Sequence, residues 1–382
     1  MKILHLCLGN FFIDGYSYQE NLLPKYHVKM GHDVLVIASL FTFDSQGRGS
    51  WIGGPCEYDD PAGFHVKRLA FRRPSCVFRT LRKYKGFYDS IAKFSPDIIF
   101  SHNVSFADTT VVAKYLKNHS EVRLFADNHG DFVNSARNWI SYHIKHKILW
   151  RYYAKQLEPY LQKCYGVTPM RCRFLKEMYH ISPDKVEFLP MGVDDDAIPT
   201  NRKDVRNRIR KELHIGNNDF VIFTGGKIDR LKNTHILISA LEQINIPDVR
   251  LIICGTLTPE MEYLNAKIGS NKFIHYLGWC DASRVMECMI ASDIACFPGT
   301  HSTLWEQAVG VGLPLIVKQW DEMEHVNVNG NCLFVCGDNP DELVKDIREF
   351  CSGDNFLEFK EKADLASKSF LYSQIAKKSI GK

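Results

Sequence analysis

The sequence of 382 residues predicts an α/β protein with two Rossmann-like domains, each a doubly wound parallel sheet. Short apolar runs alternate with stretches of helical periodicity along most of the chain. Between residues 221 and 317, glycines, lysines, hydroxyls or a carboxylate follow these runs. A chain of this length exceeds what one core usually holds, which favours two domains of about 180 residues.

The composition is that of an ordinary soluble protein, with 45% hydrophobic and 24% charged residues. No apolar run approaches the roughly 18 residues that a membrane span needs, and the N-terminus enters a strand rather than a signal peptide. We therefore expect a cytoplasmic location. The twelve cysteines are scattered, which favours free thiols over disulfides. Cys332 and Cys336 lack a second matching pair, so we expect no zinc site.

The net charge of +4 is too small to indicate nucleic acid, but the basic residues are unevenly distributed. Residues 67–85 hold eight basic side chains and no acidic one, and residues 139–153 mix aromatic with basic side chains. Two interpretations remain open. These segments form a solvated helix face and an aromatic core stripe, or they rest on anionic lipid head groups as a peripheral membrane contact.

The N-terminal half begins with a strand over residues 2–8, then an irregular loop containing Gly15. Ser17 is placed to cap a helix reaching Met30, and Pro24 predicts a kink or a late start in it. Further strands are expected at residues 33–38, 97–101, 122–126 and near 164–167. This alternation predicts a mostly parallel sheet with helices on both faces.

The polar stretch over residues 190–219 is the best linker candidate, with a boundary between 195 and 215 and a new unit from Phe220. We therefore expect one domain at 1–195 and a second at 196–365. A helix over 366–382 would pack back toward the first domain. Inside the second domain, Asp281 is placed to cap a helix.

Two glycines and two lysines suggest a phosphate site in this second half. Lys227 and Lys232 flank a strand-to-helix turn in which Gly225 and Gly226 allow close backbone approach. Each lysine at about 4 Å from a phosphate would contribute roughly 1 to 4 kcal/mol, depending on shielding. The alternative is a pair of solvated loop lysines.

A second strand end carries the complementary features. Pro298 and Gly299 end a strand, and the helix expected from Thr303 would present amides at its start. The four residues at that start are His301, Ser302, Thr303 and Leu304. Glu306, one turn into the helix, is suited to accept hydrogen bonds from two ribose hydroxyls, or is simply a helix acid. Gly278 and Trp279 end another strand, where backbone groups could read a base.

These motifs resemble the GT-B retaining glycosyltransferases of group 1, family GT4. The resemblance covers nearly the whole chain and is strongest over residues 221–335. The matching motifs are Gly15 with Gly31-His32-Asp33-Val34, Leu189-Pro190-Met191-Gly192-Val193-Asp194, Gly226-Lys227 with Lys232-Asn233, Tyr276-Leu277-Gly278, and Pro298-Gly299 with Glu306-Gln307-Ala308 and Gly312-Leu313-Pro314.

The resemblance implies two domains that face each other across a cleft and transfer a sugar from a nucleotide donor with retention of configuration. It implies an acceptor-binding domain at 1–195 and a nucleotide-sugar-binding domain at 196–365. Lys227 and Lys232 would neutralise the departing diphosphate with the amides of Ser302, Thr303 and Leu304. Glu306 would hold the ribose, and Gly278 with Trp279 the base. His129 resembles the family histidine beside the donor sugar, and Gly15 would let the N-terminal loop approach phosphate and acceptor.

Three departures from the family pattern limit this transfer. The family usually carries two glutamates separated by seven residues, but here Pro298 stands eight positions before Glu306, and His301 takes roughly the place of the first glutamate. Lys227 replaces an arginine, which removes bidentate phosphate contact. Gly15 stands alone where two adjacent glycines are common. The identity of the donor sugar is therefore not transferred.

The resulting hypothesis is a retaining hexosyltransferase that needs no metal or cofactor. It would use a nucleotide sugar, with UDP as the default base, and a saccharide or lipid-linked acceptor in surface-glycan biosynthesis. The acidic run Asp194, Asp195 and Asp196 is interpreted as part of the linker rather than as a metal site. A sugar-nucleotide epimerase or hydrolase on the same fold, and a non-catalytic nucleotide-sugar-binding protein, remain as alternatives. An epimerase would need further carboxylates near His129, where only Asp131 is visible.

Overall fold

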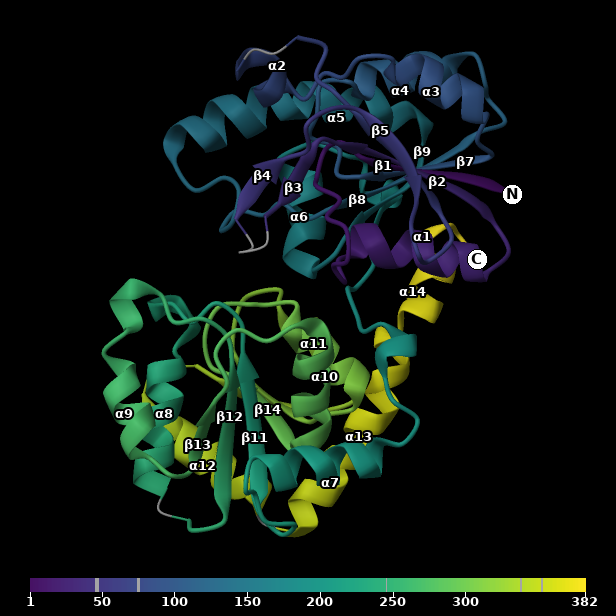
Figure 1. The fold of residues 1–382 in the computed structure, drawn as a ribbon. Coiled ribbons are helices and arrows are strands. Elements are labelled where there is room, and N and C mark those ends of the chain that lie inside the picture. Colours follow the sequence, from purple (N-terminus) through teal and green to yellow (C-terminus); the bar gives the residue numbers. More distant parts are fainter. Residues whose placement is uncertain (45–47, 74–75, 245, 337–338, 352) are drawn as a thin grey trace. The chain divides into compact units, whose positions relative to one another are not determined.

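The structure is a computed structural model that describes residues 1–44, 48–73, 76–244, 246–336, 339–351 and 353–382. The chain forms two compact units (Figure 1). Unit 1 comprises Met1–Pro190 with Ile375–Lys382, and unit 2 comprises Met191–Gln374. This division lies ahead of the expected interval of 195–215.

Unit 1 is built on an eight-stranded sheet in the order β10-β9-β8-β7-β1-β2-β6-β5. Every pairing in it is parallel except that between β5 and β6. The strands are β1 Lys2–Cys7, β2 Asp33–Ser39, β5 Cys56–Asp59, β6 His65–Leu69, β7 Ile98–His102, β8 Arg123–Asn128, β9 Leu161–Gly166 and β10 Val186–Phe188, with a separate antiparallel pair of β3 Phe41–Phe43 and β4 Gly49–Trp51. The central strands are buried along nearly their whole length, as the apolar runs predict for a sheet covered on both faces.

The strand order reverses between β1 and β7, so their carboxyl ends form a switch point at which loops diverge. The covering helices are α1 Gln19–Lys29, α2 Cys76–Leu81, α3 Phe87–Phe94, α4 Thr109–Lys117, a π-helix η1 Ser141–Trp150, α5 Arg151–Leu157, α6 Pro169–Glu177 and the end of α14 Tyr372–Ser379, with short 3₁₀ turns η2 Glu158–Tyr160 and η3 Pro183–Lys185. The five expected strands of this half are present with shifted ends. The expected cap of α1 is wrong. Tyr18 holds the N-cap position without a side-chain hydrogen bond, and Pro24 lies inside the helix.

Unit 2 is a six-stranded parallel sheet in the order β13-β12-β11-β14-β15-β16. Its strands are β11 Phe220–Gly225, β12 Val249–Cys254, β13 Ile274–Tyr276, β14 Ile294–Phe297, β15 Leu315–Lys318 and β16 Cys332–Val335. In chain order this is the doubly wound arrangement 3-2-1-4-5-6 of dinucleotide-binding sheets. Its switch point lies between β11 and β14.

The helices of unit 2 are α7 Arg202–Glu212, α8 Thr234–Ile244, α9 Leu264–Ser270, α10 Ala282–Ala291, α11 Leu304–Val311, α12 Pro340–Cys351 and α13 Gly353–Ser367, with 3₁₀ turns η4 Asp195–Ala197, η5 Arg230–Lys232, η6 Pro259–Met261, η7 Glu324–Val326 and η8 Lys368–Phe370. Figure 1 shows α8 and α9 on one side of the strands and α10 and α11 on the other. Asp281 caps α10 as expected, because its side chain accepts from the amide of Arg284 at 2.8 Å.

The polar stretch interpreted as a linker is largely not one. Residues 202–212 form α7, whose Ile209 and Arg210 are buried. The guanidinium of Arg210 donates to the carbonyl of Ala291 at 2.9 Å and to the Asp293 carboxylate at 2.8 Å. A sequence dense in Arg and Lys hides this role, since a buried arginine and a solvated one look alike in composition.

Two further findings concern the whole described chain. None of its helices is long and apolar enough to cross a bilayer. The cysteine side chains that the structure describes are free thiols, as expected from their scattered positions.

Candidate functional site

The loops that follow β11 and β14 meet at the switch point of unit 2. A side chain at Gly299 would lie 2.3 Å from the carbonyl of Leu231, so only glycine permits this approach. The amide of Thr300 donates to the same carbonyl at 2.9 Å, and the Asn233 side chain donates to the carbonyl of Pro298 at 3.1 Å. The two strand ends named in the sequence analysis therefore form one structure.

Lys232 lies inside this structure. Its ammonium group donates to the carbonyls of Thr300 at 2.7 Å and His301 at 2.8 Å. Burial lowers the pKa of Lys232 to about 8, against the opposing charge of Asp229. An ammonium has three donors, so one remains for a phosphate oxygen. Lys227, by contrast, is exposed, and the two lysines are not equivalent.

Glycines bring the ends of β11, β12 and β13 together. Gly226 has φ +107°, which favours glycine, and a side chain at Gly255 would lie 1.9 Å from the Gly226 carbonyl. The amide of Gly255 donates to the carbonyl of Gly278 at 2.7 Å. Trp279, next to Gly278, is 74% exposed. Gly226, Gly278 and Trp279 thus lie along one edge of the sheet.

The start of α11 offers fewer amides than expected. Ser302 already engages two of them, because its hydroxyl accepts from Leu304 at 3.3 Å and its carbonyl from Trp305 at 3.0 Å. The inclusion of Leu304 among the anion-binding amides is therefore not supported by the structure. The backbone amides of Ser302 and Thr303 donate no hydrogen bond to any of the described residues.

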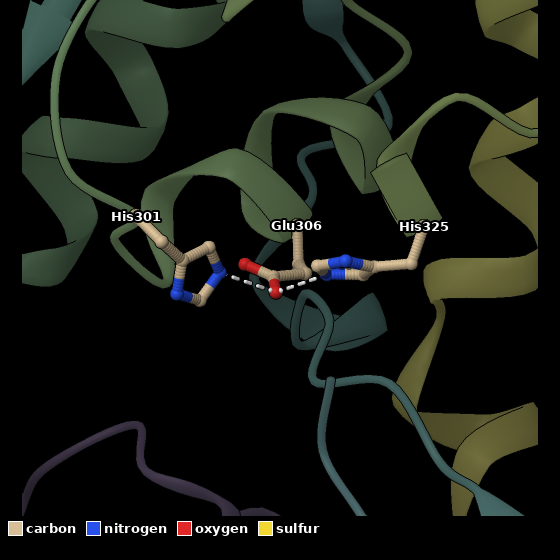
Figure 2. Close-up of side chains that lie close together, drawn as sticks. All are labelled: His301, Glu306 and His325. Carbon is tan, nitrogen blue, oxygen red and sulfur yellow. Dashed lines mark hydrogen bonds and ion pairs between the residues drawn. The ribbon is translucent and has the colours of Figure 1, made fainter. Parts of the chain in front are cut away.

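Glu306 is fully buried in α11 and lies between two histidines (Figure 2). Its Oε1 accepts from Nε2 of His301 and from Nε2 of His325, each at 2.8 Å. Burial raises the pKa of this carboxyl, but the two imidazoles outweigh burial and hold the pKa well below its usual range. The other oxygen, Oε2, is buried and has no hydrogen-bond partner among the described residues. Glu306 is therefore an anion with one saturated oxygen and one unsatisfied oxygen.

His325 is a residue that the sequence analysis missed. It lies in η7, nineteen positions after Glu306, and its side chain is 1% exposed. No spacing rule connects a residue after β15 with one in α11, so only the sheet topology reveals the contact. The three donor atoms of His301, Glu306 and His325 lie within 4.8 Å of one another and could also hold a metal ion.

The acidic run Asp194, Asp195 and Asp196 serves local structure. Asp194 accepts from the amide of Asp196 at 3.2 Å, and Asp195 accepts from the amide of Ser373 at 3.1 Å. These bonds assign two of the three carboxylates to a 3₁₀ turn and to the first turn of α14.

In unit 1, His129 follows β8 and stands beside carboxylates. Its Nε2 lies 3.5 Å from Oδ2 of Asp127 and 3.9 Å from Oε1 of Glu20. Burial lowers the pKa of His129, but the charge of Asp127 outweighs burial, so the net pKa is raised. Gly15 lies in the exposed loop after β1 with φ +76°.

Asp127 and Glu20 were not identified from the sequence, although Asp127 stands only two positions before His129. The sequence analysis considered Asp131 instead. That carboxylate is buried and accepts from Nε of Arg171 at 3.2 Å, so it is held in an ion pair. A β-strand places alternate residues on one face, and this period of two was the available signal for Asp127.

The basic segment 67–85 is less exposed than its sequence suggests, and residues 74–75 lie outside the described residues. Arg68 is buried, donates to the carbonyl of Ser39 at 2.9 Å and pairs with Asp14 at 2.7 Å. Arg82 donates to the carbonyls of Gly9 and Ser105. These two arginines hold loops in place and are not available to a membrane.

The segment 139–153 divides between core and surface. Trp150 and His146 are buried, as a core stripe requires. The opposite side exposes large apolar side chains, namely Trp139, Ile140, Ile144, Ile148 and Tyr152. Lys145 and Lys147 lie between them and are exposed. The structure therefore places part of this segment in the core and leaves an apolar and basic side exposed.

Family models match both halves of the chain. Residues 23–197 match the model described as Glycosyltransferase Family 4, and residues 205–368 match Glycosyl transferases group 1. No curated protein matches the sequence.

Solved structures with similar folds cover nearly the whole chain. Anabaena HepE in complex with UDP has a TM-score of 0.69 and 17% identity, over 99% of this chain and 98% of HepE. Sucrose-phosphate synthase from Thermosynechococcus elongatus has a TM-score of 0.68 and 15% identity, over 99% and 96%. WaaG, a glycosyltransferase involved in lipopolysaccharide biosynthesis, has a TM-score of 0.65 and 16% identity, over 100% of both chains.

The two Rossmann-like sheets, the two family models and these similar structures agree. The chain belongs to the glycosyltransferases of the GT-B fold, with a group 1 domain over residues 205–368.

Proposed function

We propose that the protein is a retaining, metal-independent glycosyltransferase that uses a nucleoside-diphosphate sugar. The observation that carries the proposal is the switch point of unit 2, where Lys232, two free amides and the Glu306 carboxylate lie at one sheet edge. Cations and helix-start amides suit a diphosphate, and a buried carboxylate suits vicinal hydroxyls of a ribose. This is the ligand chemistry of a nucleotide sugar.

Lys232 and the amides of Ser302 and Thr303 would stabilise the diphosphate as it departs. In the proposed step, the bond between the anomeric carbon and the β-phosphate oxygen breaks, and the acceptor oxygen bonds to the same face of that carbon. The acceptor proton passes to the departing phosphate oxygen. Most of the rate acceleration would come from donors already fixed where negative charge develops. Lys227, being exposed, would act as a mobile second cation.

His129 and Gly15 would act on the sugar from unit 1. The raised pKa of His129 favours an imidazolium, which is a hydrogen-bond donor at both nitrogens. It would position a sugar hydroxyl rather than accept a proton. The exposed loop at Gly15 would admit phosphate and acceptor.

UDP is the proposed nucleotide, with Gly278 and Trp279 beside the base. Similarity to HepE, which was solved in complex with UDP, supports this choice at the level of the fold. The solvent-exposed Trp279 ring offers a face for stacking of any base. A comparison of UDP, GDP and ADP affinities by calorimetry tests it, and a preference for GDP or ADP would reject UDP.

The acceptor is proposed to be a saccharide or a lipid-linked saccharide, with the enzyme resting on an anionic membrane. The support is the exposed row of Ile140, Ile144 and Ile148 with Trp139 and Tyr152 at its ends and Lys145 and Lys147 beside it. Apolar and aromatic side chains enter the interface while lysines meet anionic head groups.

Vesicle sedimentation tests this surface. Wild type should sediment with phosphatidylglycerol vesicles and less with phosphatidylcholine vesicles. A triple variant Ile140→Ser, Ile144→Ser and Ile148→Ser should lose most of that binding and keep UDP affinity. Equal sedimentation of variant and wild type would reject the membrane contact.

The reaction itself is tested by mixing the protein with UDP-sugars and candidate acceptors. We expect UDP release that depends on acceptor, and a product whose anomeric configuration by NMR equals that of the donor. UDP release at the same rate without acceptor would indicate a hydrolase. Calorimetric UDP-sugar binding without turnover on any acceptor would indicate a binding protein.

A further inference from the structure

Three histidines of unit 1 form a buried row that the proposed reaction does not use. His5 lies on β1, His27 on α1 and His102 on β7, and all three side chains are inaccessible to solvent. Histidine is buried with intermediate frequency, and a buried histidine usually needs hydrogen-bond partners for its two ring nitrogens. Here they bond mainly to one another.

The row is continuous from the end of α14 to Asp127. Nε2 of His27 lies 3.0 Å from the carbonyl of Ala376, and Nδ1 of His27 lies 2.9 Å from Nε2 of His5. Nδ1 of His5 lies 3.0 Å from Nε2 of His102, whose Nδ1 lies 2.9 Å from Oδ2 of Asp127. Two hydrogen bonds therefore join the three imidazoles, and two more connect the row to Ala376 and to Asp127.

Both ends of this row are acceptors. The carbonyl of Ala376 has no proton to give, and the Ser379 hydroxyl beside it, 3.2 Å from His27, donates to that same carbonyl. His27 must therefore donate through Nε2, and a neutral His27 accepts through Nδ1. A neutral His5 in turn donates to His27 through Nε2 and accepts from His102 through Nδ1.

The count of protons then leaves one imidazole doubly protonated. Four hydrogen bonds need four protons, whereas three neutral imidazoles carry three. The extra proton is best stabilised on His102, whose Nδ1 contacts the Asp127 carboxylate. His102 then donates to His5 through Nε2 and to Asp127 through Nδ1. Asp127 is suited to remain a carboxylate, because it also accepts from the Gln19 side chain at 2.8 Å and from the amide of Asn103 at 3.0 Å.

We propose that His27, His5 and His102 form a relay that stores one proton on His102, and that this cation together with Asp127 positions and charges His129. The link to His129 is its 3.5 Å approach to Oδ2 of Asp127, the atom that His102 also contacts. His102 and Asp127 are thus positioning residues. The proton count stands independently of the reaction, and only the consequence for turnover rests on the proposed function.

Other charges face the relay from the surrounding elements. Glu20 on α1 lies 3.9 Å from Nε2 of His129, and its charge raises the pKa of His129. The positive charge of Arg171 on α6 lowers that pKa. His32 and Lys382 act on His27 at the far end. Burial lowers the pKa of both His5 and His27, which favours the neutral form of these two rings.

The proton count is tested on the wild-type protein by long-range ¹H–¹⁵N NMR of ¹⁵N-histidine-labelled samples at pH 8. We expect His5 and His27 as neutral Nε2–H tautomers and His102 with both ring nitrogens protonated, although a free histidine is neutral at this pH. A neutral His102, or an Nδ1–H tautomer of His27, would overturn the proposal. The outcome does not depend on whether the protein transfers a sugar.

Two variants test the effect on His129, and they should act in opposite directions. His5→Phe keeps a ring in place but removes the acceptor of His102, which then needs only one proton. Asp127 loses its neighbouring cation, and the NMR titration midpoint of His129 should rise by roughly one pH unit. Asp127→Asn removes the anion, and the midpoint should fall by at least as much.

The matched control is His180→Asn, an exposed histidine with φ +55° that asparagine also adopts. It should leave the His129 midpoint unchanged. If the relay residues only stabilise the fold, both variants should shift the His129 midpoint in the same direction or leave it unchanged. That result would overturn the positioning role even if the wild-type proton count held.

Discussion

Glu306 shows most directly how single residues make this site. Its carboxylate is buried and is held by two imidazoles on one oxygen, while the other oxygen has no partner in the part of the chain that the structure describes. An unsatisfied buried oxygen is costly for folding and becomes useful only when a ligand supplies donors. We therefore expect the ribose hydroxyls of the nucleotide sugar to donate hydrogen bonds to this carboxylate.

Glu306→Gln tests this role. The substitution keeps the size but removes the charge, and a hydrogen bond to a charged group contributes about 1.5–3 kcal/mol, so UDP affinity should fall about 10- to 100-fold. Calorimetric titration with UDP measures the loss. Glu324→Gln, an exposed glutamate in η7, is the matched control and should keep wild-type affinity. Equal affinities in both variants would remove Glu306 from the site.

Lys232 predicts a pH dependence of donor binding. Burial lowers its pKa to about 8, and a bound diphosphate would raise it again. Binding should therefore take up protons near pH 8, and UDP affinity should decline as the pH rises from 7.5 to 9.5. Calorimetry in buffers of different ionisation enthalpy measures the uptake. Lys232→Arg keeps its charge throughout and should show no such decline; a decline of equal size would place its origin elsewhere.

The histidine pair around Glu306 also predicts a response to metal ions. The proposed reaction needs no metal, so dialysis against a chelator should leave turnover unchanged. Added Zn²⁺ should inhibit in competition with the donor, because the Glu306 carboxylate that would hold ribose is also one of the three groups that could hold zinc. Loss of turnover after chelation, restored by one metal, would show that the cluster is a metal site.

At the scale of elements, parallel strands and their carboxyl-end loops account for what the sequence could reveal. The apolar runs marked the strands, and glycines with lysines marked the ends of β11, β13 and β14. The relation between α11 and η7, or between His102 and Asp127, depends on strand order, which hydrophobic periodicity does not encode. The same limit explains why α7 was interpreted as a linker. Arg210 is a charged residue in the sequence, but in the fold it is buried and donates to the carbonyl of Ala291.

The junction of β1, α1 and α14 predicts acid sensitivity of unit 1. Burial lowers the pKa of His27 to about 4, so the unfolded chain binds a proton that the folded unit does not between pH 6.5 and 4. A lowered histidine pKa makes stability fall as the pH falls through this window. At about 1.4 kcal/mol per pH unit, the free energy of unfolding should drop by roughly 3 kcal/mol.

Urea unfolding of the protein at pH 7, 5.5 and 4.5, followed by fluorescence of the tryptophans in unit 1, measures this slope. His27→Gln cannot take up the proton, so its stability should change less across the window, from a lower starting value. His180→Asn should retain the wild-type slope. A wild-type free energy of unfolding that is constant from pH 7 to 4.5 would contradict the assignment.

At the scale of the whole molecule, the chain has two Rossmann-like units with different tasks in the proposed reaction. Unit 2 carries the features that suit a nucleotide diphosphate, and unit 1 carries His129 with the relay behind it. The end of the chain returns to unit 1, where Lys378 donates to the carbonyl of Phe188 at 2.8 Å and Ala376 ends the histidine row. The sequence predicts that the basic C-terminal helix packs back toward the first domain. It does not predict the hydrogen bond between the Ala376 carbonyl and the buried His27.

The most direct test is a crystal structure of the protein with a UDP-sugar bound. We expect the diphosphate within hydrogen-bond distance of the Lys232 ammonium and the amides of Ser302 and Thr303, and both ribose hydroxyls on the Glu306 carboxylate. A nucleotide bound away from the carboxyl ends of β11 and β14, with Glu306 still contacting only His301 and His325, would contradict the account.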